Sequence, residues 1–166
     1  MAFDAAAWSA PQYDNQMNST LEGTALNDVI SGGGGDDILR GLAGDDVLSD
    51  GRGSDHLYGG SGADVFVMKD DGAYDTISDF EVGVDRVDVS DYVMTYAPDQ
   101  LQVTALSGGM TIWFGSERLD ILSSSGYELT VADVFGPHFI NPDRPYISNV
   151  GEILGTPQND TLVGTR

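Results

Sequence analysis

The chain has 166 residues, with 27 acidic residues against 7 Lys and Arg and a formal net charge of −20. So strong a negative charge argues against nucleic acid as a partner and opposes compaction of the chain when no cation is bound. The absence of cysteine excludes disulfides and thiolate metal sites, and no run reaches the ~18 apolar residues that a transmembrane segment needs.

The N-terminal segment Met1–Ser19 predicts a leader rather than a secretory signal. It has neither a basic n-region nor an apolar h-region. We interpret residues 1–19 as a loose leader. The alternative is that Trp8 and Tyr13 dock onto the domain that follows.

From Gly23 to Val67, five nine-residue units follow one another without a gap. Each unit has an Asp at its sixth position and an apolar residue at its eighth, and glycine is frequent in the first six positions. A flexible Gly- and Asp-rich linker would not keep an apolar residue at every ninth place. The period therefore indicates a repeat architecture.

The residue types of one unit predict a glycine turn followed by a short strand with its middle side chain facing inward. Two units then form one coil of a flattened roll, and the same loop returns every 18 residues, about 4.8 Å along the stack. Asp46 should therefore lie between Asp28 and Asp64. Stacked carboxylates repel each other unless a cation lies between them. Calcium takes six to eight oxygen ligands, which Asp side chains and glycine carbonyls can supply.

Three calcium sites are predicted, where the loop Gly23–Asp28 faces Gly41–Asp46, Gly32–Asp37 faces Asp50–Asp55, and Gly41–Asp46 faces Gly59–Asp64. Of the acidic residues, 22 are Asp and 5 are Glu, as short-reach ligation in tight loops favours. The candidate ligands are Asp28, Asp37, Asp46, Asp55, Asp64, Asp75, Gly23, Gly32, Gly33, Gly35, Gly41, Gly44, Gly51, Gly53, Gly59, Gly60 and Gly62.

The pattern resembles the RTX, or haemolysin-type, nonapeptide G-G-x-G-x-D-x-U-x. Gly32–Arg40, Gly41–Ser49 and Gly59–Val67 match it well, whereas Gly23–Ser31 lacks the fourth glycine and Asp50–Tyr58 has Asp in first place. The resemblance implies a right-handed parallel β-roll loaded with three or more Ca²⁺ ions. It also implies an extracellular protein exported by type I secretion without an N-terminal signal.

After Val67 the repeat degrades. Asp70–Ser78 keeps Asp75 at the sixth place, and Phe80–Asp88 keeps Asp85. This stretch resembles the segment after the roll in serralysin C-terminal domains and in the R-modules of mannuronan C5-epimerases. Asp75 is a candidate ligand of the last calcium site, whereas Asp79 and Asp85 could equally form an acidic surface turn.

An antiparallel β cap is predicted next. Leu101–Leu106 and Met110–Phe114 alternate around a Ser-Gly-Gly turn, and Glu117–Leu122 reads as a third strand. A short helix follows, with Thr130 as N-cap and Asp133 at N3. The predicted fold is all-β, with one module over residues 20–135 that comprises repeats (23–67), degenerate repeats (68–89) and cap (90–135).

The C-terminal residues predict a linker and a second module. Residues 136–150 carry three of the six prolines, as an extended linker would. Gly155–Val163 then mirrors Gly23–Ser31, so residues 151–166 are interpreted as the start of a further repeat module. Neighbouring modules of the same chain are therefore expected partners.

Catalysis by the module itself is not expected. The two histidines, His56 and His138, lie in no HExxH motif, and there is no cysteine nucleophile. Two functions stay open: a calcium-dependent structural and secretion module, and a module that binds an anionic, alginate-like polysaccharide for an attached enzyme. The second would use an outward patch of Arg40, His56 and Tyr58, since an arginine beside an aromatic ring suits a uronate.

Overall fold

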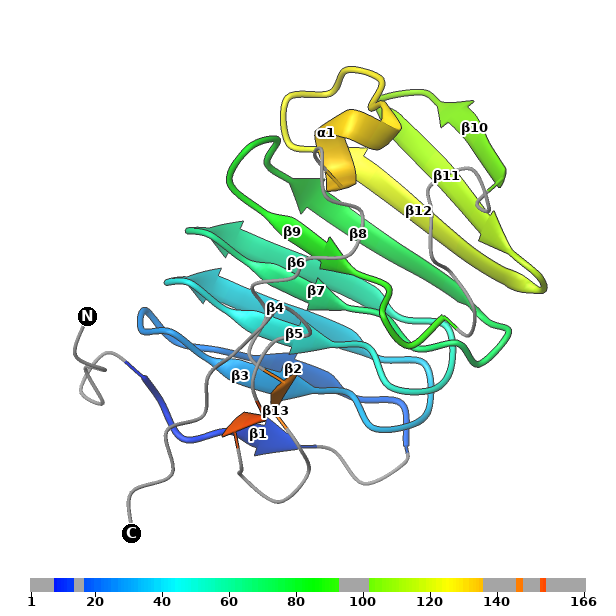
Figure 1. The fold of residues 1–166 in the computed structure, drawn as a ribbon. Coiled ribbons are helices and arrows are strands. Elements are labelled where there is room, and N and C mark those ends of the chain that lie inside the picture. The colour runs from blue at the N-terminus through cyan, green and yellow to red at the C-terminus, as the bar shows by residue number, and fades with distance from the viewer. Residues whose placement is uncertain (1–7, 14–16, 93–101, 136–145, 148–152, 155–166) are drawn as a thin grey trace, which may run out of the picture.

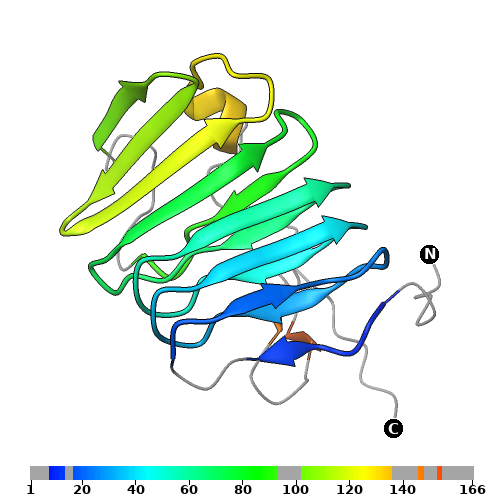
Figure 2. The same cartoon turned by 180° about the vertical axis from the view of Figure 1, so that it is seen from behind.

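A computed structural model describes residues 8–13, 17–92, 102–135, 146–147 and 153–154. The chain winds as a solenoid in which successive strands alternate between two facing sheets (Figure 1). The coils stack along one axis from the N-terminal strands to the cap, as the view from behind also shows (Figure 2). The predicted all-β roll with antiparallel strands at its C-terminal end is confirmed.

The first sheet has five parallel strands, most of them three residues long. Its order is β1-β3-β5-β7-β9, and units one, three and five of the repeat supply its three central strands. The register places Ile30 beside Leu48 and Leu48 beside Phe66. The strands are β1 (Gln12–Tyr13), β3 (Val29–Ser31), β5 (Val47–Ser49), β7 (Val65–Val67) and β9 (Arg86–Asp88).

The second sheet has seven strands and joins the roll to the cap. Its order is β10-β11-β12-β8-β6-β4-β2; the cap strands pair antiparallel, but β12 pairs parallel with β8 and so continues the roll. The strands are β2 (Thr20–Glu22), β4 (Ile38–Ala43), β6 (His56–Ser61), β8 (Tyr74–Phe80), β10 (Gln102–Leu106), β11 (Gly109–Phe114) and β12 (Glu117–Ser123).

One continuous core fills the space between the sheets. The eighth residue of every unit is fully buried, because in each extended triplet at positions seven to nine the middle side chain faces inward. The core continues through Ile77 and Phe80 into the cap, where Leu119 and Ile121 are also fully buried. The short helix α1 (Val131–Phe135) closes the end with Val134 and Phe135. Thr130 and Asp133 form the predicted reciprocal N-cap.

Residues 8–13, which the sequence placed in a loose leader, lie on the roll. Gln12 and Tyr13 form β1 and pair with Ile30 and Ser31, and Trp8 makes a bridge with Asn27. Leu21, nine residues before Ile30, packs against the core from β2. The roll therefore begins before Gly23, because an earlier unit keeps the apolar eighth position without its glycines.

Two short strands, β13 (Tyr146–Ile147) and β14 (Ile153–Leu154), pair antiparallel near the C-terminus. They fall at the predicted boundary between linker and second module. The predicted repeat Gly155–Val163 lies outside the described residues. Among the described residues, no helix is long and apolar enough to cross a membrane.

Candidate metal centre

The turns between the two sheets form two stacked rows. The first turn row runs from the seven-stranded to the five-stranded sheet, and its turns end in Asp28, Asp46, Asp64 and Asp85. The second turn row runs back; two of its turns end in Asp37 and Asp55, and the third leads into β8, whose second residue is Asp75. All seven of these side chains are buried. Hence the predicted stacking order is present.

One oxygen of each repeated carboxylate ties two coils together. Asp46 Oδ1 accepts the backbone N–H of Asp28 at 2.7 Å, and Asp64 Oδ1 accepts that of Asp46 at 2.9 Å. Asp55 Oδ1 accepts the N–H of Asp37 at 2.7 Å in the second turn row. The degenerate units keep the ladder, since Asp75 and Asp85 bond the coil before them although their turns are longer.

The other oxygen of these carboxylates lacks a hydrogen-bond donor among the described residues in three of the units. The Oδ2 atoms of Asp46, Asp55 and Asp64 are buried and accept no hydrogen bond from any residue that the structure describes. An ionised oxygen buried without a donor costs several kcal/mol. The arrangement therefore calls for a positive charge at the turns.

First-position glycines leave room for that charge. A Cβ added to Gly41 would lie 2.2 Å from Asp46 Oδ2 and 2.5 Å from the carbonyl oxygen of Gly59. At Gly23 the corresponding oxygens are Asp28 Oδ2 and Gly41 O, at 2.7 and 2.4 Å. At Gly32 they are Asp37 Oδ2 and Asp50 O, at 2.6 and 2.3 Å. At each of the three loop pairs predicted to bind calcium, the carboxylate of one turn and a carbonyl oxygen of the next coil therefore converge.

The remaining predicted ligand glycines shape the turns. Gly33, Gly35, Gly44, Gly51, Gly53, Gly60 and Gly62 all have φ between 82° and 136°. L-residues rarely adopt this region, which explains glycine at these places. Close approach of coils adds a second constraint: a Cβ on Gly62 would lie 1.9 Å from the carbonyl oxygen of Gly44.

The electrostatics of the turns favour a bound cation. Burial raises the pKa of Asp46 to about 6, and that of Asp55 and Asp64 to about 7, while backbone N–H donors oppose the rise and neighbouring carboxylates add to it. At neutral pH the ionised forms therefore carry a cost that a bound cation would remove.

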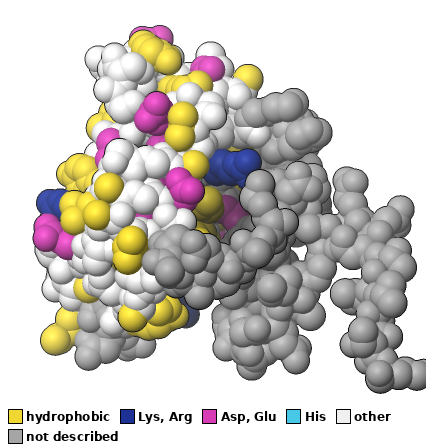
Figure 3. All heavy atoms as spheres, turned by 90° about the vertical axis from the view of Figure 1, so that its left-hand side faces the viewer, with side chains coloured by type: hydrophobic (Ala, Val, Ile, Leu, Met, Phe, Trp, Pro, Cys, Tyr) yellow, Lys and Arg dark blue, Asp and Glu magenta, His cyan; other side chains and the backbone are white. Residues whose placement is uncertain are grey.

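The donor set fits calcium better than a soft metal. In the described part of the chain, no three His, Cys, Asp or Glu side chains converge on one point, so backbone carbonyls must supply most ligands. Hard, oxygen-only ligation of this kind suits calcium and not zinc. Figure 3 views the side of the molecule at the left of Figure 1, where acidic side chains are scattered over a largely white surface. The repeated carboxylates themselves are buried.

A second ladder, at the fifth position of the units, was not predicted. Asn27 Oδ1 accepts the N–H of Asp45, and Asp45 Oδ1 accepts that of Ala63, both at 2.9 Å. Asn18 and Asp36 do the same in the second turn row. The recurring Asn or Asp before the sixth-position Asp was the signal that could have revealed it.

The sequence left open whether Asp79 and Asp85 are calcium ligands or part of a surface turn; in the structure both accept backbone N–H groups. Asp79 accepts the N–H groups of Gly59 and Gly60 at 2.9 and 3.0 Å. Asp85 accepts those of Asp64 and Glu81 at 3.1 and 2.8 Å.

Sequence reasoning missed Asp50, which is buried at the first position of its unit. It accepts the N–H groups of Gly51 and Lys69, and burial raises its pKa to about 8.

The candidate polysaccharide patch lies on the seven-stranded sheet. Ile38 pairs with His56 and Arg40 with Tyr58, as the repeat register predicts. The Arg40 guanidinium lies 5.2 Å from the centre of the Tyr58 ring, and it is 3.8 Å from the Glu22 carboxylate.

A model of the RTX calcium-binding nonapeptide repeat matches residues 13–48 and 40–67. Among solved structures, the chain is similar to the solution structure of the AlgE6R3 subunit from the Azotobacter vinelandii mannuronan C5-epimerase. The two are 26% identical with a TM-score of 0.52, over 89% of this chain and 93% of that chain. No curated protein matches the chain.

Proposed function

Because the chain carries RTX calcium-binding repeats and an RTX β-roll related to an epimerase R-module, we propose that it is a non-catalytic module that folds when calcium binds. The observation that carries this proposal is the set of buried Asp Oδ2 atoms, which converge with carbonyl oxygens over first-position glycines. Without a cation these negatively charged oxygens would repel each other. With one, they become ligands.

We assign three ions to the three predicted loop pairs. Asp46 serves two of them, because it faces the turn of Asp28 on one side and that of Asp64 on the other. Glycine carbonyls of both turns complete the oxygen set. Since these ligands are assembled only in the roll, calcium binding adds directly to the free energy of folding.

A role in export follows from the same coupling. RTX repeats are typical of secreted bacterial proteins. Where calcium is scarce, as in the cytosol, the acidic chain would stay unfolded and suited to type I secretion; at millimolar extracellular calcium it would fold. The extracellular location and the type I route therefore belong to this proposal.

The absence of catalysis is also proposed. His56 is exposed on β6, and the repeated carboxylates are engaged with backbone N–H groups and the assigned cations. A carboxylate that ligates a metal lacks the free lone pairs that general acid–base catalysis needs.

The test is circular dichroism of metal-free protein titrated with calcium, and with magnesium as the matched control. We expect a largely disordered chain in EDTA and a cooperative gain of β signal in millimolar calcium. Magnesium should be much weaker, because it demands shorter, octahedral ligation. A β signal that EDTA does not change would contradict the proposal.

Polysaccharide binding is the second candidate, favoured by the Arg40–Tyr58 pair. A second cluster of the same kind lies on the same sheet, where Arg118 lies 5.2 Å from the Tyr74 ring and 5.3 Å from the Trp113 ring. The enzyme named in the similar structure is a mannuronan epimerase, and mannuronan is a polyuronate. Arginine pairs with carboxylates and aromatic rings stack on sugar faces.

Affinity electrophoresis in alginate would test the patch. The double variant Arg40→Ala and Tyr58→Ala should lose retention while its calcium-driven folding is unchanged. The matched control is Arg86→Ala, which removes an exposed arginine from the five-stranded sheet. Undiminished retention of the double variant would rule the patch out.

A further inference from the structure

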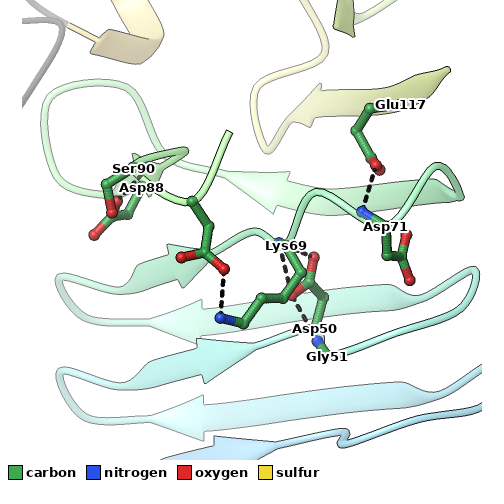
Figure 4. Close-up of polar contacts among 8 residues, drawn as sticks. Asp50, Gly51, Lys69, Asp71, Asp88, Ser90 and Glu117 are labelled. Carbon is green, nitrogen blue, oxygen red and sulfur yellow. Dashed lines mark hydrogen bonds and ion pairs between the residues drawn. The ribbon is translucent and has the colours of Figure 1, made fainter. Parts of the chain in front are cut away.

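Glu117 is a buried carboxylate that the cap, not the repeat, contributes. It begins β12 and is 1% exposed. Its Oε2 accepts the backbone N–H groups of Asp71 at 3.0 Å and Gly72 at 2.7 Å, so the side chain reaches down into the last turn of the second turn row (Figure 4). Its Oε1 is buried without a hydrogen-bond partner among the residues that the structure describes.

The register of β12 explains why a glutamate is there. Leu119 lies opposite Asp75, so the place where another coil would supply a sixth-position Asp holds an apolar residue. Glu117 comes two residues earlier on the same inward face of the strand. With one more methylene than Asp, its carboxylate reaches the backbone N–H groups of Asp71 and Gly72, in the turn just before Asp75. Glu117 therefore brings a carboxylate to the coil of Asp75 from a strand that lacks the sixth-position aspartate.

Asp75 and Glu117 are both buried and lie on the paired strands β8 and β12, so that two like charges are brought together when both are ionised. Asp75 Oδ1 already accepts the N–H of Asp55 at 3.0 Å. Asp75 is 2% exposed and Glu117 is 1% exposed, so water screens neither carboxylate. Two ionised carboxylates buried on neighbouring strands need either a shared proton or a cation.

The other turn row ends differently. Both oxygens of Asp85 accept backbone N–H groups, one from the preceding coil and one from its own turn. The first turn row is thus closed by local hydrogen bonds. The second row ends in two carboxylates contributed by separate parts of the chain.

We propose that Asp75 and Glu117 bind one further calcium ion at the junction of roll and cap, outside the nonapeptide repeats. The inference rests on the proposed calcium-dependent folding of the roll. Its consequence is that the cap docks on the last coil only when calcium is present there, because the ion joins ligands from both parts.

Calcium stoichiometry and cap docking can be measured on the same variant. Glu117→Gln keeps the length and an acceptor for Asp71 and Gly72 but removes the charge. Equilibrium dialysis should then give one calcium fewer per chain than for the unmodified protein. In a Trp8→Phe background, the fluorescence of Trp113 reports the cap, and its calcium midpoint should rise about tenfold or more because the ligand charge falls. Glu128→Gln, an exposed cap residue, should change neither.

Two outcomes would overturn this site. An unchanged ion count for Glu117→Gln would favour a shared proton between the two carboxyl groups. If Glu117→Gln does not fold in saturating calcium, Glu117→Asp, which keeps the charge but shortens the reach, should bind the full ion count at a raised midpoint; an unmoved midpoint would contradict the site. Unmodified protein whose circular dichroism does not respond to calcium would instead contradict the proposed function, so the two failures are distinguishable.

Discussion

The roll and the cap bury similar apolar side chains but treat their polar groups in opposite ways. In the cap, apart from Glu117, buried polar side chains find side-chain partners: Thr111 donates to Asp120 at 2.7 Å, and the hydroxyl groups of Ser123 and Ser125 lie 2.6 Å apart. In the roll, buried carboxylates present an oxygen with no donor among the described residues. Apart from Glu117, the cap can therefore be stabilised by protein contacts, whereas the roll needs an external charge.

This difference explains how a chain that buries so little apolar surface in each nine-residue unit can fold. Each repeat strand buries one apolar side chain, which is little to offset the entropy of ordering nine residues. The carboxylate ladders fix the coil spacing, and the cation is the missing stabilising group. Only at Glu117 does the cap take part in the chemistry of the roll.

The largest effect is expected from filling a cation position. Gly41→Ala would place a methyl group 2.2 Å from Asp46 Oδ2 and 2.5 Å from Gly59 O, so both oxygens must move or the ion must leave. We expect calcium-driven folding to be lost, or its calcium midpoint to rise by at least tenfold. Overpacking alone costs about 1–3 kcal/mol. A calcium titration followed by circular dichroism measures the midpoint.

Gly126→Ala in the cap is the matched control. A Cβ there meets no atom within 4 Å, so only the backbone strain of its φ of 77° remains. That strain costs about 1–2 kcal/mol. Equal midpoint shifts for the two variants would show that the space at Gly41 is not needed for an ion.

A smaller effect distinguishes two aspartates within the roll. Asp46→Ala should raise the calcium midpoint more than Asp28→Ala, because Asp46 serves two sites and Asp28 one. Asp28 Oδ2 already accepts the N–H and hydroxyl of Thr24, whereas Asp46 Oδ2 has no donor in the described part of the chain. Removal of Asp46 also leaves the N–H of Asp28 without its charged acceptor, which is worth about 1.5–3 kcal/mol. Equal midpoints would argue against the stacking order as the basis of calcium binding.

The stacking of the roll could be predicted because its period carries the information. An Asp at every ninth residue fixes which loops meet, so Asp28, Asp46 and Asp64 were placed correctly before any strand was known. The parallel pairing of β12 with β8 could not be foreseen, since no repeat links them. Glu117 was missed for the same reason: its role depends on a contact between segments about 45 residues apart. The strand Gln12–Tyr13 was missed because its unit has lost its glycines and its aspartate.

Acidity should act on the metal-free and calcium-loaded roll with opposite signs. Burial holds the folded-state pKa of Asp46 near 6 and of Asp55 and Asp64 near 7, above the ordinary value of 3.8. Without metal, their contribution favours folding fully below about pH 4 and is lost as the pH rises through 6 to 7. In chelated protein the β signal should therefore grow as the pH falls from 7.5 to 4.5.

In saturating calcium the same acidification should release the ions, because protons compete for the ligands, and the midpoint should rise. Circular dichroism at a series of pH values, with and without calcium, tests both signs. If the metal-free chain lost structure on acidification, burial of these carboxyl groups would not be what opposes folding at neutral pH.

The smallest effect is expected at the helix of the cap, which supplies none of the proposed calcium ligands. Thr130 Oγ1 accepts the N–H of Asp133, and Asp133 Oδ2 accepts the N–H of Thr130 at 2.8 Å, which together close the first turn of α1. Thr130→Ala should cost about 1 kcal/mol, as the loss of an N-cap does. Since Val134 and Phe135 cover the end of the core, thermal unfolding of the calcium-loaded protein should show this loss. The calcium midpoint of the roll should not move, because the helix lies outside the ladder of carboxylates. A midpoint shift as large as that of Asp28→Ala would mean that the helix holds the last coil in place, and that roll and cap fold as one unit.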